Sequence, residues 1–273
     1  MLEIRKTIHE AEKVYDTGAR PILVTCDDVQ DWVCKHNQPS KLCNEIIGSK
    51  FAEIWNLKTP EICLINVIED HIPKKYLNVL QPINFRKLCF GSLYRANSKE
   101  LDSSTTLLFK ESGFRKKIKN REDFLKIALF DIWLSNEDRN FNNSNLFIDF
   151  EKSDQIYFWV FDHGEIFNSN SIQHGTFIIT EDESIIKTEL ANILFKKGQK
   201  LTDTVNNLVE NFYLCTSECE QNLTGVLDLI PTQWGVDLDE LEKNIRKELF
   251  TKEWLEECEQ TFRSFIQINI TNK

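Results

Sequence analysis

Two polar segments, each next to apolar neighbours, constrain the possible fold more than any other feature of the sequence. The first is residues 136–147 (NEDRNFNNSNLF) and the second is residues 161–164 (FDHG). A largely apolar run at 124–134 precedes the first segment and has helical spacing. Residues 146–150 and 156–161 have the composition of two short strands around a polar turn. The sequence therefore predicts the order helix, polar loop, strand, turn, strand, followed by Asp-His-Gly.

The oxygen-bearing side chains of these segments have the chemistry of a magnesium-nucleotide phosphoryl-transfer site. Such a site works mainly by positioning groups and by neutralising charge with a metal. Magnesium takes hard oxygen ligands, usually one or two carboxylates beside phosphates and water. Asp138 is therefore predicted to receive or orient the proton of a substrate hydroxyl, and Asn143 and Asp162 to ligate the metal. The alternative is a polar turn with capping Asn and Asp side chains, because a D-x-x-x-x-N match alone is weakly specific.

The composition is that of a globular protein without membrane or nucleic-acid character. The chain has 273 residues, 41% hydrophobic and 28% charged, enough for one large domain or two lobes. No apolar run approaches membrane-spanning length and residues 1–16 lack a signal-peptide core, so we expect a cytoplasmic protein. The formal net charge of -10 disfavours a general nucleic-acid binder. The eight cysteines are scattered without zinc spacing, which indicates reduced and mostly buried thiols.

The first third of the chain is predicted to be β-rich with one helix. The predicted strands are residues 21–26, 31–36, 61–68 and 87–94. The helix is predicted at 42–55, where apolar residues recur on one side. From Thr188 onward the pattern is that of successive amphipathic helices, interrupted at Pro231 and Gly235.

Lys35 is predicted to be the cation beside the nucleotide phosphates. It lies in a predicted strand, ten residues before Glu45 at the start of the predicted helix. A strand lysine paired with a helix glutamate fixes the ammonium group beside the α- and β-phosphates. Glu53 on the same helix competes with Glu45 as the partner. A solvated strand lysine is the alternative interpretation.

Residues 16–21 are the candidate lid over the phosphates. This segment holds a single glycine, Gly18, and not the G-x-G-x-x-G of ordinary protein kinases. The backbone amides of Gly18, Ala19 and Arg20 could still bind phosphate oxygens as an anion-binding nest. The alternative is a plain turn before a strand.

With these residues assembled, the chain resembles the HipA-like kinase family, in particular its compact HipA-like kinase domain group. The matching segments are residues 17–21, 32–35, 44–45, 57–60, 90–92, 136–140 with Asn143 and Asn145, 162–164 and 231–234. The resemblance implies an α+β, bilobal, protein-kinase-like fold. It implies a small β-rich N-lobe with one helix at 1–96 and a large helical C-lobe at 97–273.

The resemblance also implies ATP and magnesium as cofactors and transfer of the γ-phosphoryl group to a hydroxyl, with Ser or Thr of a protein as the expected acceptor. Lys35 and Asp138 would be the catalytic residues, and Asn143 and Asp162 the metal ligands. The implied nucleotide-binding residues are Gly18, Ala19, Arg20, Lys35, Glu45, Phe90, Gly91 and Ser92. Asn145 would support the loop or assist the metal. Arg139, directly after the catalytic Asp, is similar to the phosphatidylinositol-kinase arrangement.

Two other functions stay open. The first is a lipid or small-molecule kinase. Antibiotic kinases usually carry His where this chain has Asn136, whereas the basic run at 115–121 would suit a lipid surface unless it is a solvated loop or helix start. The second is a pseudokinase whose acidic C-terminal helices dock a regulatory protein partner. The presence of Asp138 disfavours this reading, because a non-catalytic scaffold has no chemical need for it.

Overall fold

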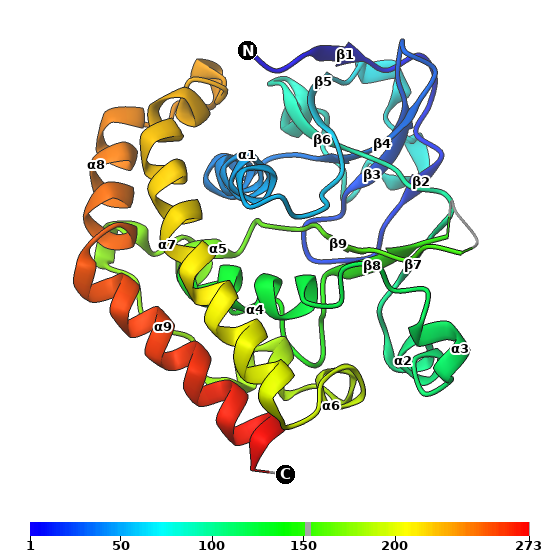
Figure 1. The fold of residues 1–273 in the computed structure, drawn as a ribbon. Coiled ribbons are helices and arrows are strands. Elements are labelled where there is room, and N and C mark those ends of the chain that lie inside the picture. The colour runs from blue at the N-terminus through cyan, green and yellow to red at the C-terminus, as the bar shows by residue number, and fades with distance from the viewer. Residues whose placement is uncertain (151–153, 273) are drawn as a thin grey trace.

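The computed structural model describes residues 1–150 and 154–272. It is a mixed α and β structure in which helix α1 (Pro39–Ile54) lies between an N-terminal sheet and a set of C-terminal helices (Figure 1). A second, smaller sheet lies beside the C-terminal helices. The α+β class predicted from the sequence is confirmed.

The N-terminal sheet has six strands in the order β1-β5-β6-β4-β3-β2. Its strands are β1 (Ile4–Lys6), β2 (Lys13–Val14), β3 (Ile22–Thr25), β4 (Asp31–Lys35), β5 (Ile62–Asn66) and β6 (Cys89–Leu93). Neighbours pair antiparallel except β1 and β5, which are parallel. The four predicted strands correspond to β3, β4, β5 and β6. Strands β1 and β2 were not predicted, because they are short edge strands without a buried apolar repeat.

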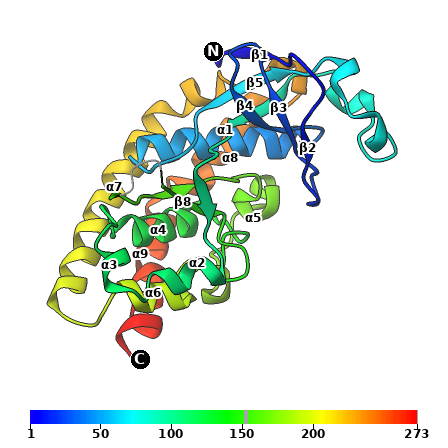
Figure 2. The same ribbon diagram turned by 90° about the vertical axis from the view of Figure 1, so that its right-hand side faces the viewer.

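Alternation along β4 separates the two faces of this sheet. Trp32 and Cys34 belong to a buried cluster on one face. The cluster is covered by the segment between β5 and β6, which contributes Ile72, Leu80 and Phe85. Figure 2 shows this segment on the side of the sheet away from the C-terminal helices. Lys35, the next residue of β4, is therefore left on the opposite face, toward α1.

The second sheet consists of β7 (Ser98–Glu100), β8 (Leu146–Asp149) and β9 (Phe158–Val160), all antiparallel. Strands β8 and β9 confirm the predicted strand pair. The turn predicted between them lies partly outside the described residues. Strand β7 was not predicted, because it is a three-residue polar segment (SKE).

The helices after β7 are α2 (Ser103–Leu108), α3 (Ser112–Arg115), α4 (Asp123–Leu134), α5 (Ile166–Asn170), α6 (Glu189–Leu194), α7 (Gln199–Leu227), α8 (Leu238–Leu249) and α9 (Lys252–Ile266), followed by a π-helical turn at Gln267–Thr271. Four of these helices, namely α4, α6, α7 and α8, are those that the apolar spacing predicts. Helix α4 is buried along all its residues except Lys126, so it is the central helix of the core. The interruption predicted at Pro231 and Gly235 lies between α7 and α8.

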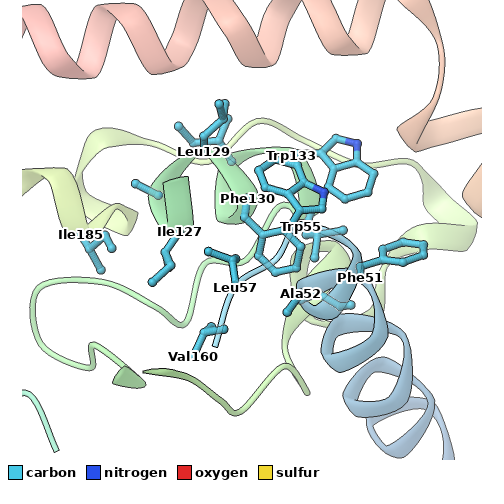
Figure 3. Packing of buried hydrophobic residues seen from close by; sticks show 14 of the residues in the cluster. Phe51, Ala52, Trp55, Leu57, Ile127, Leu129, Phe130, Trp133, Val160 and Ile185 are labelled. Atoms are coloured by element: carbon cyan, nitrogen blue, oxygen red, sulfur yellow. The ribbon is translucent and has the colours of Figure 1, made fainter. Parts of the chain in front are cut away.

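Helix α1 shares one hydrophobic core with α4 and α7. The Trp55 ring stacks on Trp133 with centroids 5.5 Å apart and meets the edge of Phe130 at 5.1 Å (Figure 3). Phe51 also stacks on Trp133, at 5.4 Å. The Phe212 ring of α7 meets the Trp55 ring edge to face, with centroids 5.9 Å apart. Aromatic packing of this kind fixes α1 relative to α4. The division into lobes at residues 96 and 97 stays a prediction, since one core extends across it.

All eight cysteines are free thiols, and all except Cys215 are buried. The expected reduced and mostly buried thiols are confirmed. Within residues 1–150 and 154–272, no helix combines the length and the apolar character that crossing a bilayer requires.

Candidate active site

Lys35 is held between two carboxylates that come from distant parts of the chain. Its Nζ lies 2.5 Å from Oε1 of Glu45 on α1 and 2.7 Å from Oδ1 of Asp162, just after β9. The side chains of Lys35 and Glu45 are 15% and 4% exposed. Glu53, the competing glutamate, pairs instead with Lys50 at 2.8 Å. The structure therefore brings Lys35, Glu45 and Asp162 together and leaves Glu53 out.

The charges in this cluster follow from a lysine between two carboxylates. Burial by itself lowers the pKa of Lys35, but Asp162 and Glu45 outweigh burial and raise that pKa above its ordinary value. For Asp162, burial favours the neutral acid, but the Lys35 ammonium outweighs it and lowers the pKa to about 2. Burial raises the pKa of Glu45, and Lys35 opposes this effect. Lys35 and Asp162 are thus charged at neutral pH.

Helix α1 is fastened to residues 162–166 through Glu45, Asn44 and Gly48. Glu45 Oε2 accepts a hydrogen bond from the His163 backbone N–H at 3.0 Å. The Asn44 side-chain amide donates to the Gly164 carbonyl at 3.0 Å and to the Ile166 carbonyl at 3.2 Å. At Gly48 the two segments approach so closely that an added Cβ would lie 2.4 Å from the His163 Cβ. Glycine is required at this helical position because the neighbour is a buried side chain.

Asp162 has a left-handed backbone, with φ of 57°. For a residue other than glycine this conformation costs roughly 1–2 kcal/mol. The hydrogen bond from His163 N to Glu45 and the ion pair with Lys35 stabilise it. The backbone and the carboxylate of Asp162 are therefore both set by contacts with the N-terminal part of the chain.

The candidate catalytic loop (residues 136–145) is anchored to α4 by a buried ion pair. Helix α4 ends at Leu134, and Ser135 follows in the left-handed region with φ of 50°. Arg139, fully buried, pairs with Asp131 of α4 and donates from Nη2 to the Phe161 carbonyl at 2.8 Å. Arg139 therefore ties α4, the loop and the end of β9 together.

Two amides orient the carboxylate of Asp138. Its Oδ2 accepts hydrogen bonds from Asn143 Nδ2 at 3.0 Å and from Asn145 Nδ2 at 2.8 Å. Asn140 Oδ1 shapes the turn by accepting from the backbone N–H groups of Asn142 at 2.9 Å and Asn143 at 3.3 Å. The Asn145 side chain is thus a support of the loop, and no metal contact is needed to explain its position.

The loop and Asp162 are neighbours because β8 and β9 pair. Asn145 precedes β8 and Phe161 follows β9, and the Phe161 N–H donates to the Asn145 carbonyl at 3.4 Å. Asp138 is bonded to Asn145, and Asp162 is the residue after Phe161. The pairing of β8 and β9 therefore brings the candidate catalytic loop close to Asp162.

The candidate lid (residues 16–21) is the tip of the β2–β3 hairpin. The Arg20 N–H bonds to the Thr17 carbonyl at 3.0 Å, and Arg20 has a left-handed φ of 46°. His36 Nε2 donates to the Arg20 carbonyl at 3.3 Å. The lid, including Gly18 and Ala19, borders a pocket of about 480 Å³. The residues lining it do not include those of the Lys35–Glu45–Asp162 cluster, so phosphate binding by the lid stays a prediction.

Phe90, Gly91 and Ser92 lie in β6, next to β4. Lys35 is paired with Phe90 in the sheet register, and Phe90 is buried in the core with α1. Gly91 faces the other way, and a Cβ there would lie 2.5 Å from Cδ1 of Ile65. Packing on the outer face therefore accounts for Gly91. Ser92 is partly buried and remains on the face of Lys35.

Sequence reasoning did not assign roles to Asn44, Gly48 and Arg139. A glycine inside a helix is one signal that could have been used, because it is unfavourable by about 1 kcal/mol unless close packing requires it. The contacts of Asn44 and Arg139 join distant segments, and such contacts leave no periodic pattern in the sequence.

The comparisons with known proteins agree with this arrangement at the level of the family. The model of the HipA-like kinase family matches residues 8–266, so the chain belongs to this family and is a kinase by family. A search of curated proteins found no match.

Several solved kinase structures are distantly similar in fold. The proinflammatory kinase CtkA of Helicobacter pylori is 12% identical, with 97% of this chain and 94% of that chain covered and a TM-score of 0.45. The Golgi casein kinase with Mn/ADP bound is 12% identical, with coverage of 94% and 73% and a TM-score of 0.46. HipA of Shewanella oneidensis MR-1, in a complex with HipB and operator DNA, is 10% identical, with coverage of 95% and 63% and a TM-score of 0.41. At these scores, family membership rests on the family match alone.

Proposed function

We propose that the protein is an ATP- and magnesium-dependent kinase that transfers the γ-phosphoryl group of ATP to a serine or threonine hydroxyl of a protein. The observation that carries this proposal is the contact of Lys35 with both Glu45 and Asp162, at 2.5 and 2.7 Å. A buried lysine that keeps its charge is suited to bind phosphate oxygens. An ionised aspartate beside it is suited to bind a divalent metal.

The residues fit a magnesium ion. Asn143 uses its amide nitrogen to bond Asp138, and in the described part of the chain no donor is bonded to its Oδ1. Asp162 supplies an ionised carboxylate. The described residues hold no cluster of three or more His, Cys, Asp or Glu side chains suited to a metal, but a magnesium site completed by phosphates and water needs only few protein ligands. When bound, magnesium-ATP would supply the phosphoryl group and neutralise its charge.

Asp138 is the candidate general base. Two amides fix its Oδ2, whereas no donor among the described residues is bonded to its Oδ1. That oxygen is therefore proposed to accept the proton of the acceptor hydroxyl. Under this proposal residues 1–96 supply the lid, Lys35 and Glu45, and residues 97–273 supply the base and the metal ligands.

The proposal is tested by incubating purified protein and a cell lysate with radiolabelled ATP and magnesium. Wild type should label protein on serine or threonine, and Asp138→Asn should reduce labelling at least about 100-fold. Asp203→Asn, the same change on an exposed position of α7, is the control and should label like wild type. Equal labelling by wild type and Asp138→Asn would contradict the proposal.

The basic run at 115–121, which would suit a lipid kinase, makes contacts within the chain. Arg115 Nη1 donates to the carbonyls of Phe109 at 2.8 Å and Lys110 at 2.9 Å, and Arg121 Nη1 donates to the Leu194 carbonyl at 3.3 Å. Arg115 thus caps the backbone just after α2, and Arg121 caps the last residue of α6. This observation favours the helix-end interpretation over a membrane patch.

A further inference from the structure

A groove of about 660 Å³ runs beside the candidate catalytic loop. One wall is the segment that joins β7 to α2, a second is the end of the loop, and a third is the segment that leads into α6. Phe124 and Ile185, both fully buried, are at its base. We call it the carboxylate groove.

The groove reaches the candidate catalytic base. Asn143 lines it, and the same side chain is hydrogen-bonded to Asp138 at 3.0 Å. Phe141 also lines it and is 55% exposed, in the turn where Asn140 accepts from the Asn142 N–H. A large aromatic side chain exposed next to a reactive group is more consistent with contact to a partner than with folding.

Carboxylates dominate the charge of the groove. Four line it, namely Glu100, Asp102, Asp182 and Glu189. The lysine that lines it, Lys187, is bound by Asp182 and Glu181. Glu189 forms an exposed ion pair with Lys110 at 2.8 Å, which a basic residue of an occupant would have to replace. Glu100 makes no side-chain hydrogen bond or ion pair with the described residues. Burial, and after it the neighbouring Asp102 and Asp162 carboxylates, raise its pKa.

We propose that the carboxylate groove binds a lysine- or arginine-containing segment of the acceptor protein, with an apolar residue against Phe141 and basic residues beside Glu100 and Glu189. This inference rests on the proposed function, because it places the acceptor next to Asp138. The negative charge of the groove carboxylates favours a basic occupant and disfavours the binding of nucleic acid. The mixture of aromatic, aliphatic and carboxylate side chains suits a polypeptide, which presents apolar and cationic groups in alternation.

The experiment measures binding separately from catalysis. The probe is a fluorescein-labelled 12-residue peptide with one serine flanked by arginines and one leucine, compared with a peptide in which glutamines replace the arginines. Fluorescence anisotropy gives the Kd of each peptide for the full chain. The variants are Glu100→Gln, Glu189→Gln and the double variant. Glu253→Gln is the control, since Glu253 also lies in the first turn of a helix, α9.

Wild type should bind the basic peptide at least about tenfold more tightly than the neutral peptide, and the difference should shrink as salt is added. Each groove variant should weaken binding of the basic peptide by about two- to fivefold, since both carboxylates are exposed. Binding of the neutral peptide should not change. Glu253→Gln should bind both peptides like wild type.

The inference is overturned if both peptides bind equally, or if the groove variants bind the basic peptide as well as wild type does. It is also overturned if spermine binds in a manner that depends on Glu100 and Glu189 while the basic peptide does not, because the groove would then select a small cation. Phosphate incorporation into the peptide is recorded in parallel. Charge-dependent binding without incorporation would support the groove and count against the proposed function.

Discussion

The Lys35–Glu45–Asp162 cluster and the lid are expected to serve the same nucleotide, yet they are built differently. The cluster joins β4, α1 and the segment after β9, and buried contacts at Asn44 and Gly48 hold it. The lid is an exposed hairpin tip with an open glycine, and His36, the residue after β4, donates a hydrogen bond to it. Contacts with the core therefore position Lys35, the proposed phosphate-binding cation, whereas the candidate lid is held by few contacts outside its own hairpin.

Replacing Lys35 should have the largest effect. Lys35→Met removes the cation and leaves Glu45 and Asp162 near each other without compensation, so phosphate transfer should fall at least about 100-fold. Initial rates with saturating ATP measure the loss. Lys6→Met removes an exposed strand lysine of β1 and is the control, with a rate near that of wild type. Retention of more than a tenth of the rate by Lys35→Met would separate the cluster from the chemistry.

A single methyl group at Gly48 should break the contact between α1 and the Asp162 segment. The new Cβ would lie 2.4 Å from the His163 Cβ, and overpacking of this kind destabilises by about 1–3 kcal/mol. Denaturant unfolding measures the loss of unfolding free energy. The KM for ATP should rise in the same variant.

The matched control for this change is Gly225→Ala. Gly225 is also inside a helix, α7, but an added Cβ meets nothing within 4 Å. Alanine there should stabilise by about 0.5–1 kcal/mol, because it is the better helix former. If both alanine variants were stabilised, the tight approach of α1 to His163 would not exist in solution.

The Lys35–Glu45–Asp162 cluster should also make the free energy of unfolding depend on pH. The pKa of Asp162 is lowered to about 2 by Lys35, so the stability that its ionisation contributes is fully present above the unfolded value of about 3.9 and is lost as the pH falls toward 2. The difference in unfolding free energy between wild type and Asp162→Asn should therefore shrink between pH 5 and pH 2. A difference that is constant over this range would show that Asp162 is not coupled to Lys35.

The smallest effect is expected at the lid. A Cβ at Gly18 meets nothing within 4 Å, so Gly18→Ala should change the unfolding free energy by less than about 0.5 kcal/mol. If lid amides approach the phosphates closely, the KM for ATP should still rise several-fold. Gly113→Ala, at another open glycine, should leave the KM unchanged. An unchanged KM in Gly18→Ala would favour the plain turn over the phosphate-binding nest.

Local patterns in the sequence predicted the elements that carry the site. The strands β3 to β6, β8 and β9 and the helices α1, α4, α7 and α8 follow from apolar alternation or helical spacing. The edge strands β1 and β2 and the strand β7 escaped prediction because they are short and bury little apolar surface. Tertiary pairing, not local preference, makes them strands.

The candidate site was also predicted only in part, because the sequence shows residue types and their order but not the contacts between distant segments. Order along the chain and residue type suggested Lys35, Glu45 and Asp162, and the structure brings them into contact. Chain order and residue type could not decide whether Glu45 or Glu53 pairs with Lys35, since both glutamates are on α1. The pairing depends on the direction in which each side chain points. The buried tie made by Arg139 and the close approach at Gly48 depend on segments far apart in sequence. Only the folded arrangement shows them.

The most direct measurement of the central claim is calorimetric titration of ATP into the protein with magnesium and with a chelator. If Asp162 and Asn143 bind the metal beside Lys35, magnesium should tighten ATP binding to wild type at least about tenfold, and Asp162→Asn should lose that gain. An equal magnesium effect in wild type and in Asp162→Asn would contradict the account.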